Sequence, residues 1–342
     1  MSTLYYGDNL KILRDDIKDA FGWFGLYAFL IALLLSVPVT AQEILFANGK
    51  DARHIPFELS DRNSDNHIYL QVSANGSGPF RFMLDTGASH SFLAVRTAQR
   101  LGLSLTEIGK VGGGIGDDPP RVWDIHEPVS LDLPGVRIPG RKMVAVKTDG
   151  AEKCINRSAA GAEPRLLDGV LGADIFSDLV VSIDYKRKLI DLYTLKTFRN
   201  VVGGKAIEFN VEKTSGYILA RIAVKGTLNK KSVGLSVVID TGAGDTLTLS
   251  PLIWKSKNLA PPADVTRVIR DCGVGGDESI PTLVGDLAWL KIGDLTLDRP
   301  VTRFSQTWSP EYHDGILGNA ALRNFDVVVF DYHNNRMIVI KP

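Results

Sequence analysis

Short alternating and apolar runs dominate the chain after about residue 66. Residues 68–72 alternate between apolar and polar side chains, and residues 80–84 form an apolar run, with the turn-forming segment 75–79 between them. This pattern predicts a β-hairpin. Segments 129–133 and 287–292 are equally typical of strands.

Helical spacing is confined to short segments. One covers residues 93–101. The other covers about 251–258, where Ser250 is a natural N-cap and Pro251 occupies the first helical position. Because strand patterns far outnumber helical ones, we expect a mainly β fold.

The order of motifs along the chain repeats once. Asp-Thr-Gly-Ala stands at 85–88 and again at 240–243, each time after an apolar run typical of a buried strand. Asp-Gly-aliphatic-Leu-Gly follows each copy, beginning at Asp168 and at Asp314, and a strand pattern ending in Asp-Tyr comes after it. Signals that recur in the same order indicate an internal repeat.

The repeat supplies two carboxyl groups in the same local setting. One aspartate cannot act as general acid and general base on the same water in one step, whereas two that share a proton can. The two first aspartates of the repeats, Asp85 and Asp240, are therefore the candidate catalytic pair.

On these motifs, about residues 67–341 resemble the pepsin and retropepsin superfamily of aspartic peptidases, and more narrowly the retropepsin-like aspartyl proteases of bacteria. The resemblance implies a bilobal aspartic protease fold with two pseudo-twofold-related, β-barrel-like lobes and a catalytic pair of Asp85 and Asp240. It implies that the two threonines cross-bond the loops by donating to backbone of the opposite lobe. It also implies that two glycines allow the tight turns and that two more allow close backbone approach beneath them. These supporting residues are Thr86, Thr241, Gly87, Gly242, Gly172 and Gly318.

The match has two departures. Ala88 and Ala243 stand where pepsins usually carry a hydroxyl residue, and Gly244 stands where the first copy has Ser89. These positions keep a rival hypothesis open, namely a noncatalytic peptide-binding module on a degenerate protease fold. A selective processing protease with one native target is a further alternative.

Glycine-rich segments follow both catalytic loops, at 111–116 and 273–276. The resemblance implies flap hairpins that bend over an extended peptide, with Gly113, Gly114, Gly275 and Gly276 at the bends. A phosphate-binding loop is the rival, but neither segment has the Gly-Lys-Ser/Thr ending or a following helix. A plain surface loop is the third reading.

The N-terminal 41 residues resemble a targeting segment. Residues 21–37 are uncharged and apolar, basic residues precede them, and Val39-Thr40-Ala41 offers a cleavage site before Gln42. A cleaved signal peptide and an uncleaved membrane anchor, formed by an N-terminal apolar helix, are both open, and a buried soluble helix is a third reading. Either of the first two places the enzyme outside the cytoplasm, in the periplasm or anchored to the inner membrane.

We therefore expect the following organisation: 1–41 as signal peptide or membrane anchor, 42–66 as linker or first strand, 67–195 as the N-terminal lobe, 196–214 as the interlobe connection, and 215–342 as the C-terminal lobe. Because one chain supplies both carboxyl groups, a monomer suffices.

Composition limits the remaining possibilities. Thirty-nine basic residues balance 39 acidic ones and 44% of the chain is hydrophobic, which is typical of a globular protein and not of a nucleic-acid-binding one. The cysteines and histidines show no metal-ligand spacing, so we expect no metal and no cofactor. Cys154 and Cys272 either form a cross-lobe disulfide or remain as two unpaired thiols. The sequence thus predicts an aspartic endopeptidase that acts on peptide or protein substrates.

Overall fold

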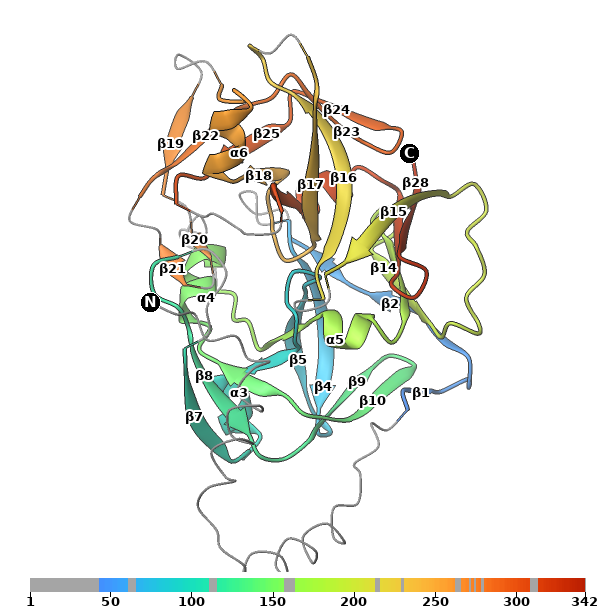
Figure 1. Ribbon diagram of the computed structural model, residues 1–342. Helices are drawn as coiled ribbons and strands as arrows, with labels where there is room; N and C mark the ends of the chain where they lie inside the picture. Colours follow the sequence, from blue (N-terminus) through green and yellow to red (C-terminus); the bar gives the residue numbers. More distant parts are fainter. Residues whose placement is uncertain are drawn as a thin grey trace, which may run out of the picture. The chain divides into compact units, whose positions relative to one another are not determined.

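The computed structural model describes residues 43–60, 66–110, 116–156, 164–212, 216–228, 231–261, 266–270, 272–273, 275–277, 280–307 and 313–341 (Figure 1). These residues belong to one compact unit, Glu43–Pro342. The predicted apolar helix at 21–37 lies outside the described residues. Within the described ranges, every helix is too short or too polar to cross a membrane.

The first large sheet is built from the first repeat (Figure 1). Its catalytic strand β5 pairs in parallel with β12 and antiparallel with β4. In spatial order its strands are β1 (Leu45–Phe46), β10 (Val136–Arg141), β9 (Val129–Leu133), β4 (Ile68–Ala74), β5 (Ser77–Leu84), β12 (Gly169–Leu171), β6 (Phe92–Ala94), β11 (Val144–Val146), β8 (Arg121–Ile125) and β7 (Leu105–Lys110), and β3 (Glu58–Leu59) pairs with β4.

The second large sheet contains the strands of the second repeat and three strands of the first. In spatial order these are β19 (Arg267–Ile269), β22 (Thr282–Asp286), β25 (Val301–Phe304), β18 (Leu247–Leu249), β26 (Gly315–Gly318), β17 (Val233–Asp240), β16 (Ile218–Lys225), β15 (Lys205–Val211), β28 (Arg336–Ile340), β27 (Val327–Asp331), β13 (Val180–Asp184), β14 (Leu189–Tyr193) and β2 (Asp51–Pro56). Two further strands, β23 (Trp289–Ile292) and β24 (Leu295–Asp298), branch from β16, and β20 (Cys272–Gly273) and β21 (Gly276–Asp277) form a separate hairpin.

The last six strands of the second sheet join the two repeats symmetrically. At their centre β13 pairs antiparallel with β27, with Ser182 opposite Val329. On the two sides, β14 and β2 mirror β28 and β15. Segment 42–66 thus contains a strand of this shared sheet, and segment 196–214 contains another.

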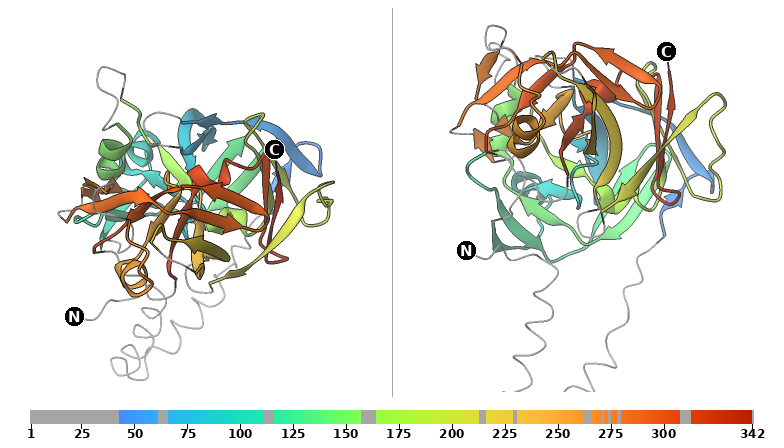
Figure 2. Two further views of the ribbon diagram at one scale, coloured as in Figure 1. Left: turned by 90° about the horizontal axis from the view of Figure 1, so that it is seen from above. Right: turned by 45° about the horizontal axis from the view of Figure 1, so that its top comes forward.

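The expectation of two barrel-like lobes is corrected by this topology. Among the described strands neither sheet closes on itself, because β1 and β7 end the first and β19 and β2 end the second. Strands that would complete a barrel for each repeat are instead used in the sheet that both repeats share. The turned view on the right of Figure 2 shows the remaining strands of the two repeats on opposite sides of the unit.

Local sequence explains where several elements begin and end. The first hairpin turns at Asn75 and Gly76, both with positive φ, as a two-residue turn of the Asn-Gly type requires. Strand β5 therefore begins at Ser77, earlier than the predicted 80–84. The two predicted helices are also shorter than expected: 93–101 contains α3 (Val95–Arg100), and 251–258 contains α6 (Pro251–Ser256). Three further short helices were not predicted, namely α4 (Asp149–Asn156), α5 (Ala173–Phe176) and α7 (Asn319–Leu322).

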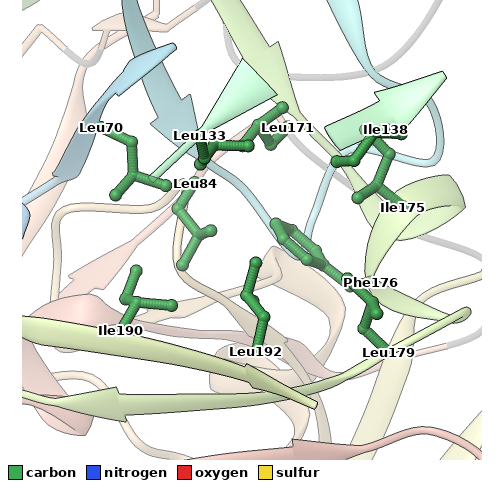
Figure 3. A pocket seen from close by; sticks show the side chains of 10 residues that line it. All are labelled: Leu70, Leu84, Leu133, Ile138, Leu171, Ile175, Phe176, Leu179, Ile190 and Leu192. Carbon is green, nitrogen blue, oxygen red and sulfur yellow. The ribbon is translucent and has the colours of Figure 1, made fainter. Parts of the chain in front are cut away.

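An apolar core holds the first catalytic strand from below. A cavity of about 10 Å³ beside it is lined only by apolar side chains. Figure 3 shows these side chains, with Leu84 and Leu171 on one side and Ile190 and Leu192 of β14 on another. The first sheet and the shared sheet therefore face each other across this core. Leu84 directly precedes Asp85 in the chain, so this packing fixes the end of β5 beneath the catalytic loop.

Candidate active site

Each candidate catalytic aspartate stands at the end of a buried strand. Asp85 follows β5, and Asp240 is the last residue of β17. The chain then turns back, and the carboxyl group accepts a hydrogen bond from a backbone N–H two residues on: Gly87 N to Asp85 Oδ1 at 2.8 Å, and Gly242 N to Asp240 Oδ1 at 2.7 Å. The same short motif thus forms the same loop twice.

The two loops are locked together by their threonines. Thr86 Oγ1 donates to Ile239 O at 2.8 Å and accepts from Thr241 N at 3.0 Å. Reciprocally, Thr241 Oγ1 donates to Leu84 O at 2.9 Å and accepts from Thr86 N at 3.0 Å. Both threonines are buried, with 1% and 0% of their surface exposed. Four buried hydrogen bonds therefore hold one loop against the other.

The glycines let each carboxyl group reach across to the opposite loop. A Cβ atom at Gly87 would lie 2.4 Å from Asp240 Cγ, and one at Gly242 would lie 2.2 Å from Asp85 Cγ. No side chain fits at such distances. With these neighbours, the carboxyl groups of Asp85 and Asp240 hydrogen-bond to each other.

Protonation of the pair follows from its surroundings. Burial raises the pKa of Asp85 well above its usual value, and the charge of Asp240 and its hydrogen bond raise it further, against the N–H donors of Gly87 and Ala88. Burial also raises the pKa of Asp240, but the hydrogen bond from Asp85, the N–H of Gly242 and the nearby His67 oppose that rise. The pair therefore holds one proton over a range of pH. Both residues remain partly exposed, so solvent reaches them.

A second pair of glycines supports the loops. In β12, Leu171 pairs with Leu84, and in β26, Gly318 pairs with Asp240. A Cβ atom at Gly172 would lie 2.7 Å from Ala88 O, and one at Gly318 would lie 2.2 Å from Asp245 O. Both positions thus need glycine because backbone of the catalytic loop passes directly over them.

Two supporting aspartates have a role that the sequence reading did not assign. Asp168 accepts from Arg81 N at 2.9 Å, and Asp314 accepts from Ser236 N at 2.7 Å. Arg81 and Ser236 each lie four residues before the catalytic aspartate of their repeat. The two carboxylates therefore clamp equivalent points of the catalytic strands. Their recurrence at the first position of Asp-Gly-aliphatic-Leu-Gly is the signal that points to this role.

Two residues beside the pair were also missed. His67 Nε2 lies 2.9 Å from Gly242 O in the second catalytic loop. On the other side stands Tyr217, whose pKa is raised by burial and then by the nearby Asp240 and Asp85. His67 follows no ligand spacing, so only its place directly before β4, the strand that pairs with the catalytic strand, could have marked it.

The predicted flap segments are described in part. Gly113 and Gly114 lie outside the described residues. The ends of the two segments meet: Asp118 N donates to Gly275 O at 3.1 Å, and a Cβ atom at Gly116 would lie 2.2 Å from the Gly275 carbonyl carbon. Gly276 has φ +78° and open space around it. The glycines at 116 and 275 thus permit close approach of loops from the two repeats.

Helix α4 of the first repeat packs against the β20–β21 hairpin of the second. Its Cys154 is disulfide-bonded, and the sequence contains one other cysteine, Cys272. Of the two alternatives left open by the sequence, an unpaired thiol is therefore excluded for Cys154. Among the described residues no group of three or more His, Cys, Asp or Glu side chains is placed to hold a metal ion.

Residues 70–175 match the family model of the aspartyl proteases. This match covers the first catalytic loop and the Asp-Gly motif of the first repeat. Among curated proteins, no relative matches the chain.

Two solved structures of seed proteins are similar to the chain at low identity. Soybean basic 7S globulin is 10% identical with a TM-score of 0.45, covering 85% of this chain and 94% of its own. Lupine conglutin gamma, described as a unique basic 7S globulin, is 12% identical with a TM-score of 0.45, covering 85% and 95%. Likeness at this level carries no argument about function.

Proposed function

Because residues 70–175 match the family model of the aspartyl proteases and the chain builds the same Asp-Thr-Gly loop twice, we propose that the protein is an aspartic endopeptidase. It hydrolyses peptide bonds with a water molecule that Asp85 and Asp240 activate together. The observation that carries the proposal is the close approach of two partly exposed carboxyl groups, each lying against the opposite catalytic loop and each with a raised pKa. Such a pair matches the acid and base that this hydrolysis needs.

The reaction uses the single proton of the pair. Asp240, ionised, takes a proton from the water as the water oxygen bonds to the peptide carbonyl carbon. Asp85, protonated, gives its proton to the carbonyl oxygen. The tetrahedral intermediate then breaks at its C–N bond. The proton now on Asp240 goes to the leaving amine, and the hydroxyl proton of the intermediate returns to Asp85, which restores the starting state.

The threonine bonds and the glycine contacts support this chemistry by keeping both carboxyl groups in place before substrate arrives. The substrate in this proposal is an extended peptide or protein segment, held near the loops that meet at Gly116 and Gly275. The enzyme acts as a monomer and outside the cytoplasm. The targeting pattern in the first 41 residues supports that location, and so does the disulfide of Cys154, since disulfides persist in oxidising compartments.

Incubation of the purified chain with a denatured protein, over a series of pH values and with or without a statine-type mimic of the tetrahedral intermediate, tests the proposal. We expect cleavage that the mimic blocks and that Asp85→Asn and Asp240→Asn each abolish. Asp298→Asn, an exposed carboxylate on β24, serves as the matched control and retains full activity.

Tight binding of the mimic or of peptides without cleavage at any pH would favour the alternative, a noncatalytic peptide-binding module. Cleavage of one envelope protein alone would favour a selective processing protease. Activity retained in Asp85→Asn would refute the roles proposed for the pair.

A further inference from the structure

The two catalytic aspartates are equivalent in sequence, but their flanks are not. Tyr69 on β4 pairs with Met83, two residues before Asp85, and Leu219 on β16 pairs with Val238, two residues before Asp240. Counting back two residues from each, His67 and Tyr217 occupy equivalent positions. The residues before them, Asn66 and Gly216, both have positive φ, of 48° and 74°.

The flank that contains His67 is polar and bound to the loop of Asp240. Asn66 Nδ2 donates to Gly244 O at 2.8 Å, and His67 Nε2 lies 2.9 Å from Gly242 O. A carbonyl oxygen only accepts, so Nε2 carries hydrogen and is the donor. Arg323 and Asn319 in turn donate to Asn66. Gly244, a departure from the first loop, thus supplies a carbonyl and not a side chain.

The equivalent flank beside the first loop has Gly216 where the other flank has Asn66. A Cβ atom at Gly216 would lie 3.5 Å from the Cβ of Ala173. Ala173 follows Gly172 as Asn319 follows Gly318, so an alanine stands where the other flank has an asparagine. Tyr217 offers a neutral phenol in place of an imidazole, because its pKa is raised by burial and by the two nearby carboxylates.

We propose, on the basis of the function argued above, that His67 is a positioning residue that breaks the symmetry of the pair. It fixes the second loop through Gly242 O and holds the negative charge on Asp240, so that Asp240 is the general base and Asp85 the general acid. An imidazolium beside one member of a carboxyl pair favours ionisation of that member. Among the described residues, the groups around it that bear or exchange charge include Asp240 and Asp85 on the loops and Arg323 beyond Asn66. They also include Tyr69, whose ring contacts that of His67, and Arg81, which lies over the Tyr69 ring.

The sign of the pH effect follows. An imidazole that carries a proton places a positive charge beside Asp240. A cation there stabilises the ionised pair, so its removal makes the first proton harder to lose. In His67→Gln, whose amide can still donate to Gly242 O, we expect the acid limb of kcat/KM to move to higher pH by about half to one unit, with KM little changed. His67→Lys, which retains a cation, returns the limb toward that of the wild type.

His333→Gln is the matched control, because His333 is an exposed histidine in the turn between β27 and β28; its profile superimposes on the wild type. Exchanging the flanks in His67→Tyr/Tyr217→His gives a second test. With the cation beside the first loop, the proton moves from Asp85 to Asp240. We follow that proton by ¹³C NMR of labelled aspartate carboxyl carbons, assigned with Asp85→Asn and Asp240→Asn, so this readout needs no turnover.

Failure of this inference is distinct from failure of the proposed function. If the wild type shows no hydrolysis, the endopeptidase proposal falls, while the NMR titration still reports which carboxyl group is ionised. If the wild type is active but the acid limb of His67→Gln superimposes on it, His67 does not set the charge. The same conclusion follows if the NMR titration of Asp240 is unchanged in folded His67→Gln or His67→Lys.

Discussion

Replacing Thr86 by valine tests how far the interlocked threonines hold the two halves together. Valine keeps the β-branched shape and nearly the same volume, so the change removes a hydroxyl and little packing. That hydroxyl donates to Ile239 O and accepts from Thr241 N across the two loops. The substitution therefore takes away two hydrogen bonds in a site that is 1% exposed.

The magnitude follows from these two bonds. A buried hydrogen bond contributes about 1 kcal/mol net, and a buried polar group that loses its partner costs about 1–3 kcal/mol. Thr86→Val should thus lower the free energy of unfolding by about 2–4 kcal/mol, a large share of the roughly 5–15 kcal/mol that a folded protein has. Thr86→Ser keeps both bonds and loses one methyl group, so its cost should stay near 1 kcal/mol.

Equilibrium unfolding in urea, followed by circular dichroism and by tryptophan fluorescence, measures these differences if the two probes give coincident transitions. The double variant Thr86→Val/Thr241→Val should cost less than the sum of the single variants, because the loops have already relaxed after the first loss. A cost below 1 kcal/mol for Thr86→Val, or an equal cost for Thr86→Ser, would refute the view that these hydroxyls lock the loops.

Three further predictions concern the carboxyl pair and the loops around it. Asp85→Asn should stabilise the fold at pH 7. The raised pKa of Asp85 means that folding takes up protons, so wild-type stability falls as pH rises above about 4, and a thermal-melt series should show a shallower fall in the variant. Gly87→Ala should lower kcat at least about 100-fold, because its Cβ would lie 2.4 Å from Asp240 Cγ, whereas Gly234→Ala on β17, where a Cβ meets nothing within 4 Å, should leave kcat unchanged. Cys154→Ser should lower the free energy of unfolding by about 2–4 kcal/mol, and a reducing agent should destabilise the wild type by the same amount but not the variant.

Local sequence patterns were enough to predict the parts of the site that occur in both repeats. The strand ends at Asp85 and Asp240 and the turns after them follow from short motifs, whereas the role of glycine at 172 and 318 was implied by the resemblance to aspartic peptidases. The start of β5 was missed because Asn75 and Gly76 complete a turn in two residues, which leaves the next residues free to pair.

Long-range pairing was beyond the sequence. Strand β2 joins the shared sheet through β14, and His54 N donates to Asp191 Oδ1 across 137 residues of chain. The pattern of side chains in residues 51–56 does not indicate that this strand pairs with β14. The prediction of barrel-like lobes was wrong for the same reason. Closure of a sheet depends on which strands pair at its edges, and the alternation of apolar and polar side chains along one strand does not reveal this.

The placement of His67 shows how two equivalent aspartates in a duplicated site can take different roles. Thr86 and Thr241 bond reciprocally, so a change in one leaves the other without its partners, and both copies keep the same residue. His67 contacts the second loop through Gly242 O, and Tyr217 occupies the equivalent position in the other repeat. These two positions carry different residues although the threonine hydrogen bonds are the same on both sides. Hydrolysis needs one acid and one base at the same moment. Reciprocal threonine bonds combined with unlike neighbours, His67 and Tyr217, meet this need. The threonine bonds bring the two carboxyl groups together, and the neighbouring residues decide which carboxyl group keeps the proton.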